Sequence, residues 1–205
     1  MSEQLERVRC PIPTRELERR WELVSKAMQK DGIDALIMQN DNGRLGGYVR
    51  YFLDFPADNA YPVTVIFFAD KSMTTIAHGG PPNPPGPPTW ATRGITERHG
   101  LPYFRSVNYT HSYDATTAEK ILKDAGVKKV GFVGFGNISA AFYKHLTEEL
   151  SKVEFINATD LVDEIKVIKS EDEIVFIRKA VQLHDDVMAV VPMLLRPGRY
   201  EYEIR

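Results

Sequence analysis

The chain has 205 residues, of which 43% are hydrophobic and 26% charged, with a formal net charge of −2 at pH 7. This composition is typical of a globular protein that can bury a sizeable core. The basic residues are scattered among acidic ones, which argues against nucleic acid or an anionic membrane as a partner. The single cysteine, Cys10, cannot form an internal disulfide. Neither an apolar run of about 18 residues nor an apolar signal core is present, so the expected location is the cytoplasm.

The first expected element is an amphipathic helix. Apolar residues recur at helical spacing at Leu17, Trp21, Val24 and Met28. We expect Thr14 to cap the start of this helix and Gly32 to end it in the left-handed conformation. A short buried strand is expected to follow over residues 34–39.

An antiparallel hairpin and a loop are expected next. Residues 63–68 are strongly β-prone, and residues 73–77 follow them across the turn at Asp70 and Lys71. Residues 79–88 read Gly-Gly-Pro-Pro-Asn-Pro-Pro-Gly-Pro-Pro. This segment can neither donate the hydrogen bonds of a sheet nor hold a helix, so it predicts a loop.

Helices and strands then alternate. We expect helices over residues 115–125 and 138–150 and strands over residues 129–133 and 153–156. Helices that separate short apolar strands cover both faces of a sheet, and the hairpin adds an antiparallel member. The expected fold is therefore a three-layer α/β/α domain with a mixed sheet.

One turn in this region is similar to a dinucleotide-binding fingerprint. Residues 134–139, Gly-Phe-Gly-Asn-Ile-Ser, follow a strand and open a helix, and Glu154 could supply the acid that binds a ribose. However, Ser139 replaces the third glycine, and the motif does not lie in the opening β-α-β unit. The favoured interpretation is a tight turn that Asn137 or Ser139 caps. A nucleotide-binding α/β module remains the remote alternative.

The sequence predicts no catalytic residue and no metal site in this chain. The five histidines are far apart, and no pair has the i, i+4 spacing of helical metal ligands. We expect His145 and His184 to lie on solvated helix faces. Cys10 has no evident base beside it and is expected to be an inert thiol. No serine lies in a Gly-x-Ser-x-Gly elbow.

A long helix is expected from about residue 171 to 191, and it is apolar over more than one face. One stripe comprises Phe176, Ala180, Leu183, Val187, Val190 and Leu194. The adjacent stripe comprises Ile174, Ile177, Val181, Met188 and Val191. Together they exceed the roughly 100° apolar face of an ordinary surface helix. The helix is therefore expected to have a second burial surface.

The last quarter of the chain resembles a known protein family. Residues 160–174 contain Ile-Lys-Ser-Glu-Asp-Glu-Ile, and residues 196–201 read Arg-Pro-Gly-Arg-Tyr-Glu. These segments are similar to the junction of creatinase/prolidase proteins, the Xaa-Pro peptidase or M24-type metallopeptidase family, where a long helix leads from the N-terminal domain into the catalytic one. The family's Thr after the Arg-Pro-Gly is absent, since Arg199 and Tyr200 stand there. The resemblance covers residues 14–205.

The resemblance implies a division into two parts. Residues 1–163 would be the creatinase/prolidase-like N-terminal domain, with a ribonuclease-H-like version of the expected fold. Residues 164–205 would be the linker helix and the start of an absent catalytic domain. In the family, that domain binds two divalent metal ions, expected here to be Mn, Zn or Co, through two Asp, one His and two Glu. No cofactor is expected in this chain.

The resemblance also implies a function for the parent protein, which would be a metal-dependent Xaa-Pro peptidase or a related hydrolase. This chain alone is expected to be inactive. Its expected partners are its own catalytic domain and further copies of the protein, as a homodimer or a higher homo-oligomer. The alternative is a stand-alone, catalytically silent binding or scaffolding domain of the same fold.

Candidate binding residues come from the segment after the first strand. Residues 40–55 are similar to the family's Asn-x-x-Tyr-Leu-Thr-Gly-Phe segment, whose following loop can reach the catalytic pocket of a neighbouring subunit. The resemblance makes Tyr51, Asp54, Asp58 and Tyr61 candidates for substrate contacts at the pocket rim. The Pro-rich loop is expected at the same rim, because it lies outside the predicted strands and its prolines limit its conformational freedom. No Lys or Arg occurs from residue 51 to 70, which argues against a creatine-like substrate. The other interpretation is that Tyr51, Phe52 and Phe55 only pack against the sheet.

Overall fold

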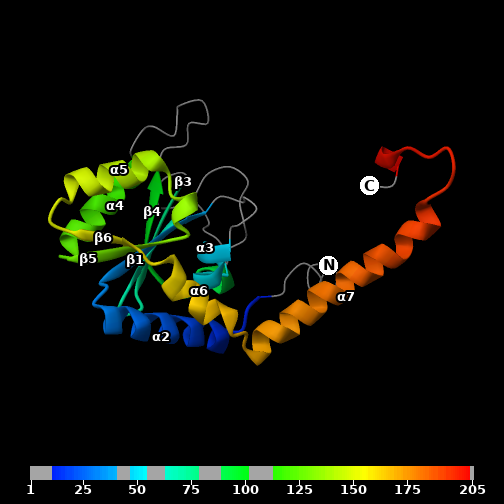
Figure 1. Ribbon diagram of the computed structural model, residues 1–205, viewed down its shortest axis with the longest axis horizontal. Coiled ribbons are helices and arrows are strands. Elements are labelled where there is room, and N and C mark those ends of the chain that lie inside the picture. The colour runs from blue at the N-terminus through cyan, green and yellow to red at the C-terminus, as the bar shows by residue number, and fades with distance from the viewer. Residues whose placement is uncertain (1–10, 41–46, 55–62, 79–88, 102–112, 204–205) are drawn as a thin grey trace. The chain divides into compact units, whose positions relative to one another are not determined.

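The computed structural model describes residues 11–40, 47–54, 63–78, 89–101 and 113–203 (Figure 1). Cys10 and the Pro-rich segment 79–88 lie outside these ranges. The chain divides into two compact units between Val167 and Ile168, and each unit is described by itself. The expected boundary between residues 163 and 164 falls inside helix α6.

The first unit is built on a six-stranded mixed sheet with the strand order β4-β3-β2-β1-β5-β6. The strands are β1 Ala35–Asn40, β2 Val63–Phe68, β3 Met73–His78, β4 Ile95–Leu101, β5 Lys129–Val133 and β6 Glu154–Asn157. Strand β2 is antiparallel to both of its neighbours, whereas the other three pairs are parallel. The mixed sheet and the β2–β3 hairpin were both expected from the sequence and are confirmed.

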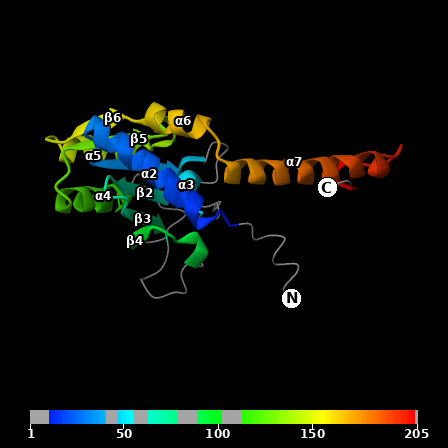
Figure 2. The same ribbon diagram turned by 90° about the horizontal axis from the view of Figure 1, so that it is seen from below.

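Helices cover both faces of this sheet (Figures 1 and 2). In the first unit they are α2 Thr14–Asp31, α3 Gly47–Phe52, α4 Tyr113–Asp124, α5 Ala140–Glu149 and α6 Thr159–Val167. The described part of this unit also contains two short 3-10 segments, η1 Thr89–Ala91 and η2 Phe135–Asn137. Helices α2, α3 and α6 pack on one face, and α4 and α5 pack on the other. The three-layer prediction is confirmed.

The period of two along each strand produces the two cores. Ala35 and Ile37 of β1 belong to the core under α4 and α5, whereas Leu36 and Met38 belong to the core under α2, α3 and α6. Successive side chains of a strand point to opposite faces, so a strand that is apolar throughout is buried on both sides. The unbroken apolar run of β1 therefore places it inside the sheet.

Helix α2 shows one correct and one wrong prediction about its ends. Gly32 has φ 65° in the left-handed region and ends the helix, as expected. Thr14 does not cap the start, because the N-cap residue is Pro13 and Thr14 is already helical. The Thr14 hydroxyl instead accepts a hydrogen bond from Arg93 Nη1 at 2.8 Å. A tertiary contact therefore takes the place of the expected cap.

Strand β4 was not predicted from the sequence. It lies at an edge of the sheet and pairs in parallel with β3. Three consecutive residues at its centre, Thr96, Glu97 and Arg98, are exposed, so the strand lacks the apolar pattern that identified the others. Charged residues are typical of an edge strand, where they oppose pairing with other chains.

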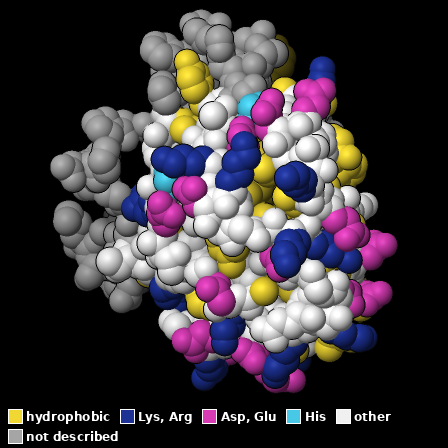
Figure 3. All heavy atoms as spheres, turned by 90° about the vertical axis from the view of Figure 1, so that its left-hand side faces the viewer, with side chains coloured by type: hydrophobic (Ala, Val, Ile, Leu, Met, Phe, Trp, Pro, Cys, Tyr) yellow, Lys and Arg dark blue, Asp and Glu magenta, His cyan; other side chains and the backbone are white. Residues whose placement is uncertain are grey.

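The surface of this unit carries both signs of charge. On the face shown in Figure 3, Lys and Arg side chains are interspersed with Asp and Glu side chains. This mixture agrees with the net charge of −2. Because the two signs of charge are mixed, that face has no extended positive potential that would attract a polyanion.

The second unit consists of the long helix α7, Glu171–Leu194, and the 3-10 segment η3, Glu201–Glu203. Ser170 and Glu173 form a capping box at the start of α7, since each side chain accepts a hydrogen bond from the other residue's backbone N–H. The helix extends beyond the expected end at residue 191 and contains Pro192. No helix in the described ranges is long and apolar enough to cross a membrane.

Both apolar stripes of α7 are accessible to solvent. No residue of this helix is buried. Its exposed large apolar residues are Val175, Ile177, Val181, Leu183, Val187, Met188, Val190 and Met193. An apolar surface of this extent is typical of a surface that another protein domain covers.

Candidate functional site

The candidate rim residue Tyr51 lies inside the first unit. It belongs to α3, and only 5% of its surface is exposed. The Arg20 guanidinium lies 4.7 Å from the centre of the Tyr51 ring and donates a hydrogen bond to the Tyr51 carbonyl. The next residue, Phe52, is fully buried, and its carbonyl accepts a hydrogen bond from Trp21 Nε1 at 2.8 Å. This burial agrees with the interpretation that Tyr51 and Phe52 pack against the sheet, whereas Phe55, the third residue of that interpretation, lies outside the described residues.

Asp54 is also buried, with 4% of its surface exposed. Its Oδ2 atom accepts a hydrogen bond from the Ile12 backbone N–H at 2.8 Å and lies 3.1 Å from Arg93 Nη2. Arg93 reaches Thr14 at the same time. One carboxylate thus joins the segment before α2, the end of α3 and the turn before β4. The contact of Tyr51 and Asp54 with substrate remains a prediction, and Asp58 and Tyr61 lie outside the described residues.

The turn after β5 has the tight geometry that the sequence favoured. Gly134 has φ 66°, in the left-handed region. Ser139 caps α5, because its hydroxyl accepts a hydrogen bond from the Phe142 N–H. The prediction that Asn137 or Ser139 caps this helix is confirmed for Ser139.

Gly134→Ala is expected to destabilise the first unit by about 1–2 kcal/mol. A Cβ at this position would lie 2.5 Å from the Tyr48 ring, and the positive φ adds backbone strain. Gly136→Ala is the matched control, because a Cβ there meets no atom within 4 Å. Urea unfolding of both variants measures the difference. Equal stability of the two variants would contradict the predicted close approach of Gly134 to Tyr48.

A cleft of about 650 Å³ lies at the carboxyl ends of β5 and β6. In an α/β sheet this is the usual side for ligand binding. Tyr48, Asp163 and Lys166 line the cleft and interact with one another. The Tyr48 hydroxyl donates to Asp163 at 2.9 Å, and Lys166 Nζ lies 4.1 Å from the centre of the Tyr48 ring. Burial, and then the Asp163 carboxylate, raise the pKa of Tyr48 to about 12.

This cleft does not present the groups that a pyrophosphate needs. The backbone N–H groups of Gly134 and Phe135 both donate to the Thr159 hydroxyl, at 3.1 and 3.3 Å. A dinucleotide site uses such amides for the phosphates. Asp160 and Asp163 also line the cleft, and their charge would repel a polyanion. The geometry therefore argues against the nucleotide-binding alternative.

The two helical histidines differ from each other. His184 is exposed, as expected. The prediction for His145 was wrong, because its Nε2 atom lies 2.8 Å from Glu119 Oε2 and joins α5 to α4. Lys123, and then His145, lower the pKa of Glu119. Among the described residues, no group of three or more His, Cys, Asp or Glu side chains is arranged to hold a metal ion.

Sequence reasoning did not identify the two arginines that fix the candidate segment. Arg20 had a local signal, since Glu16 precedes it by one helical turn and pairs with it at 2.7 Å. Arg93 had no such signal, because its partner Asp54 is 39 residues away along the chain.

Comparisons with known proteins place this architecture in a family. The pattern that describes the Creatinase/Prolidase N-terminal domain matches residues 20–168. No curated protein matches the chain by sequence.

Three solved structures resemble the chain at low sequence identity. The Xaa-Pro dipeptidase from Bacillus anthracis has 21% identity and a TM-score of 0.61, over 92% of this chain and 46% of that protein. The X-Pro aminopeptidase from Thermotoga maritima MSB8 has 16% identity and a TM-score of 0.67, over 90% and 46%. The prolidase from Pyrococcus horikoshii OT3 has 18% identity and a TM-score of 0.60, over 91% and 46%.

The structural likeness therefore supports the fold, and this chain spans less than half the length of each of the three proteins. Most of the chain lies within the family pattern, from residue 20 to the end of the first unit. The chain belongs to the creatinase/prolidase N-terminal domain family.

Proposed function

We propose that this chain is the non-catalytic N-terminal domain of a metal-dependent Xaa-Pro peptidase. The observation that supports the proposal is the family match over residues 20–168. The three peptidase structures agree with it, because this chain spans less than half the length of each. The catalytic domain would follow the chain and contribute the metal ligands. Two divalent ions there would activate a bridging water for attack on the peptide bond before proline.

The long helix α7 supports this arrangement. Both of its apolar stripes are exposed along the helix, and the catalytic domain would bury them. The energy available is substantial, because complete burial of one Val, Leu or Met side chain contributes about 1.5–3 kcal/mol.

In the same proposal, the segment after α3 forms part of the rim of the catalytic pocket. Tyr51 and Asp54 would act as supports, because each is buried and held by an arginine of the first unit. Asp58 and Tyr61 are the candidates for direct contact with substrate. The parent would act in the cytoplasm as a homo-oligomer, in which this domain can reach the active site of a neighbouring subunit.

The isolated chain is expected to self-associate through α7. Without a covering domain, the exposed apolar stripes favour contact between copies. Sedimentation velocity over a range of protein concentrations measures the association. Val187→Lys and Met188→Lys, at positions more than half exposed, should shift the protein towards monomer without altering its circular dichroism spectrum. A chain that is strictly monomeric at high concentration would contradict this expectation.

A peptidase assay tests the proposed function. The purified chain is expected to show no hydrolysis of Xaa-Pro dipeptides or longer Xaa-Pro peptides in the presence of Mn²⁺, Zn²⁺ or Co²⁺, because the catalytic ligands lie elsewhere in the parent. The same chain extended by the catalytic domain is expected to hydrolyse them and to lose activity with a chelator. Chelator-sensitive turnover by the 205-residue chain would refute the non-catalytic assignment.

A further inference from the structure

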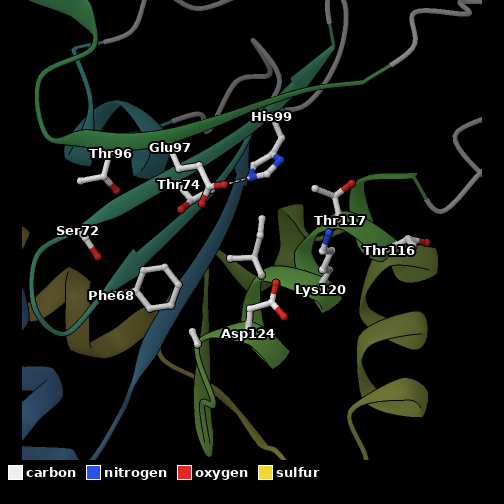
Figure 4. Close-up of a pocket in the computed structure, with 12 residues that line it drawn as sticks. Phe68, Ser72, Thr74, Thr96, Glu97, His99, Thr116, Thr117, Lys120 and Asp124 are labelled. Atoms are coloured by element: carbon white, nitrogen blue, oxygen red, sulfur yellow. Dashed lines mark ion pairs between the residues drawn. The ribbon is translucent and has the colours of Figure 1, made fainter. Parts of the chain in front are cut away.

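A groove with polar and apolar lining residues lies on the first unit, between α4 and the strands β3 and β4, of which β4 is the edge strand (Figure 4). Its volume is about 640 Å³. This lies within the range of small-molecule sites, which is about 300–1,000 Å³. The groove is separate from the cleft beside Tyr48, with which it shares no lining residue.

The wall that α4 provides carries one positive and one negative charge. Lys120 and Asp124 are one helical turn apart and both line the groove. Neither makes an ion pair or a hydrogen bond with the other described residues. Both side chains are exposed, so their charges are available to a ligand at little desolvation cost.

The opposite wall is β4, which contributes a second carboxylate. Glu97 and His99 project from this strand into the groove and lie 3.0 Å apart (Figure 4). His99 Nε2 is buried and has no hydrogen-bond partner among the described residues, so the Glu97 carboxylate keeps its capacity to accept hydrogen bonds. The α4 wall thus offers the Lys120 cation beside the Asp124 carboxylate, and the β4 wall offers the Glu97 carboxylate.

Hydroxyl groups line the space between the two walls. Thr96 and Thr117 donate their hydroxyl hydrogens to the carbonyls of Met73 and Tyr113. Their oxygen atoms keep lone pairs that can accept from a ligand ammonium group. Simple ions fit this groove poorly, because its two acids repel an anion and Lys120 repels a cation.

We infer that this groove binds a small zwitterion of the amino-acid type, such as a dipeptide. Its carboxylate pairs with Lys120, and its ammonium group pairs with Glu97 on the facing strand. A molecule with separated opposite charges satisfies both walls, which neither a simple anion nor a simple cation does. The inference rests on the groove alone and does not depend on the proposed peptidase function.

Nuclear magnetic resonance of the isotope-labelled 205-residue chain tests the inference. The probe is glycylglycine at neutral pH. Its matched analogues are N-acetylglycylglycine, which keeps only the carboxylate, glycylglycinamide, which keeps only the ammonium group, and N-acetylglycylglycinamide, which is uncharged. We expect saturable amide shifts at β4 and α4, with the tightest binding for glycylglycine and the weakest for the uncharged analogue.

Two variants identify the charges that bind. Lys120→Gln is expected to weaken glycylglycine binding about fivefold, with little effect on N-acetylglycylglycinamide. Glu97→Gln should weaken binding of glycylglycine and glycylglycinamide by a similar factor. Lys152→Gln, at an exposed position outside the groove, is the control and should leave binding unchanged.

The inference is overturned if glycylglycine produces no saturable shifts at the groove. It is also overturned if the uncharged analogue binds as tightly as glycylglycine. The same holds if the Lys120→Gln variant binds glycylglycine as tightly as the unaltered chain does. Peptidase activity of the extended protein is measured separately, so either proposal can fail while the other stands.

Discussion

Phe132→Ala is expected to destabilise the first unit by about 3–5 kcal/mol, the usual cost of truncating a fully buried aromatic residue. Phe132 lies on β5 and has no exposed surface. Its ring stacks on Phe155 at a centroid distance of 5.5 Å and meets Tyr143 edge-on at 5.4 Å. The truncation would leave a cavity between the sheet and α5 that these rings cannot fill without moving the backbone.

Phe135→Ala is the matched control for this prediction. Phe135 contacts the same ring, with a centroid distance of 5.9 Å, but 40% of its surface is exposed. Truncation of Phe135 is expected to lower the free energy of unfolding by about 1 kcal/mol, because the change removes less buried apolar area than truncation of Phe132 does. Urea unfolding of both variants gives the two free energies. Similar losses in both would contradict the placement of Phe132 at the centre of this core.

Asp54→Ala is expected to cost about 3 kcal/mol of stability. The change removes the acceptor for the Ile12 N–H and leaves the Arg93 guanidinium without its carboxylate partner. Removing one partner of a buried ion pair typically costs about 3–5 kcal/mol, and the lower end applies because Arg93 remains partly exposed.

A double-mutant cycle separates the ion pair from the other roles of Asp54. Arg93→Met alone should also destabilise, and adding it to Asp54→Ala should cost less than the sum of the two single changes. The coupling free energy reports the Asp54–Arg93 interaction. If the losses in free energy of unfolding are additive, Asp54 and Arg93 do not stabilise each other. The supporting role proposed for Asp54 at the rim would then be wrong.

The layers of the fold could be predicted because the apolar pattern that identifies each helix or strand also shows which of its faces is buried. The apolar run of β1 is buried on both faces, and the apolar repeat of α2 covers one of those faces. Strand β4 was not predicted because its central residues are exposed and show no apolar pattern. It is recognised as a strand only from its backbone pairing with β3 in the folded chain. The same limit explains Thr14 and His145, whose partners come from distant elements.

The candidate rim segment was recognised by its resemblance, but the sequence did not reveal how it is held. Asp54 looked like an available carboxylate, because a single sequence does not show that Arg93 and the Ile12 N–H converge on it. Burial of a charged group depends on where its partner lies in the folded chain. The place of a residue in a loop therefore indicates that it could contact a ligand. It does not reveal which distant residues hold that residue in position.

The central claim is that this domain works beside a catalytic domain, and the most direct test is the coding sequence beyond Arg205. The proposal predicts an in-frame continuation that supplies two Asp, one His and two Glu as ligands for two metal ions. A stop codon directly after Arg205 in the natural transcript would contradict it and would leave a stand-alone binding or scaffolding domain.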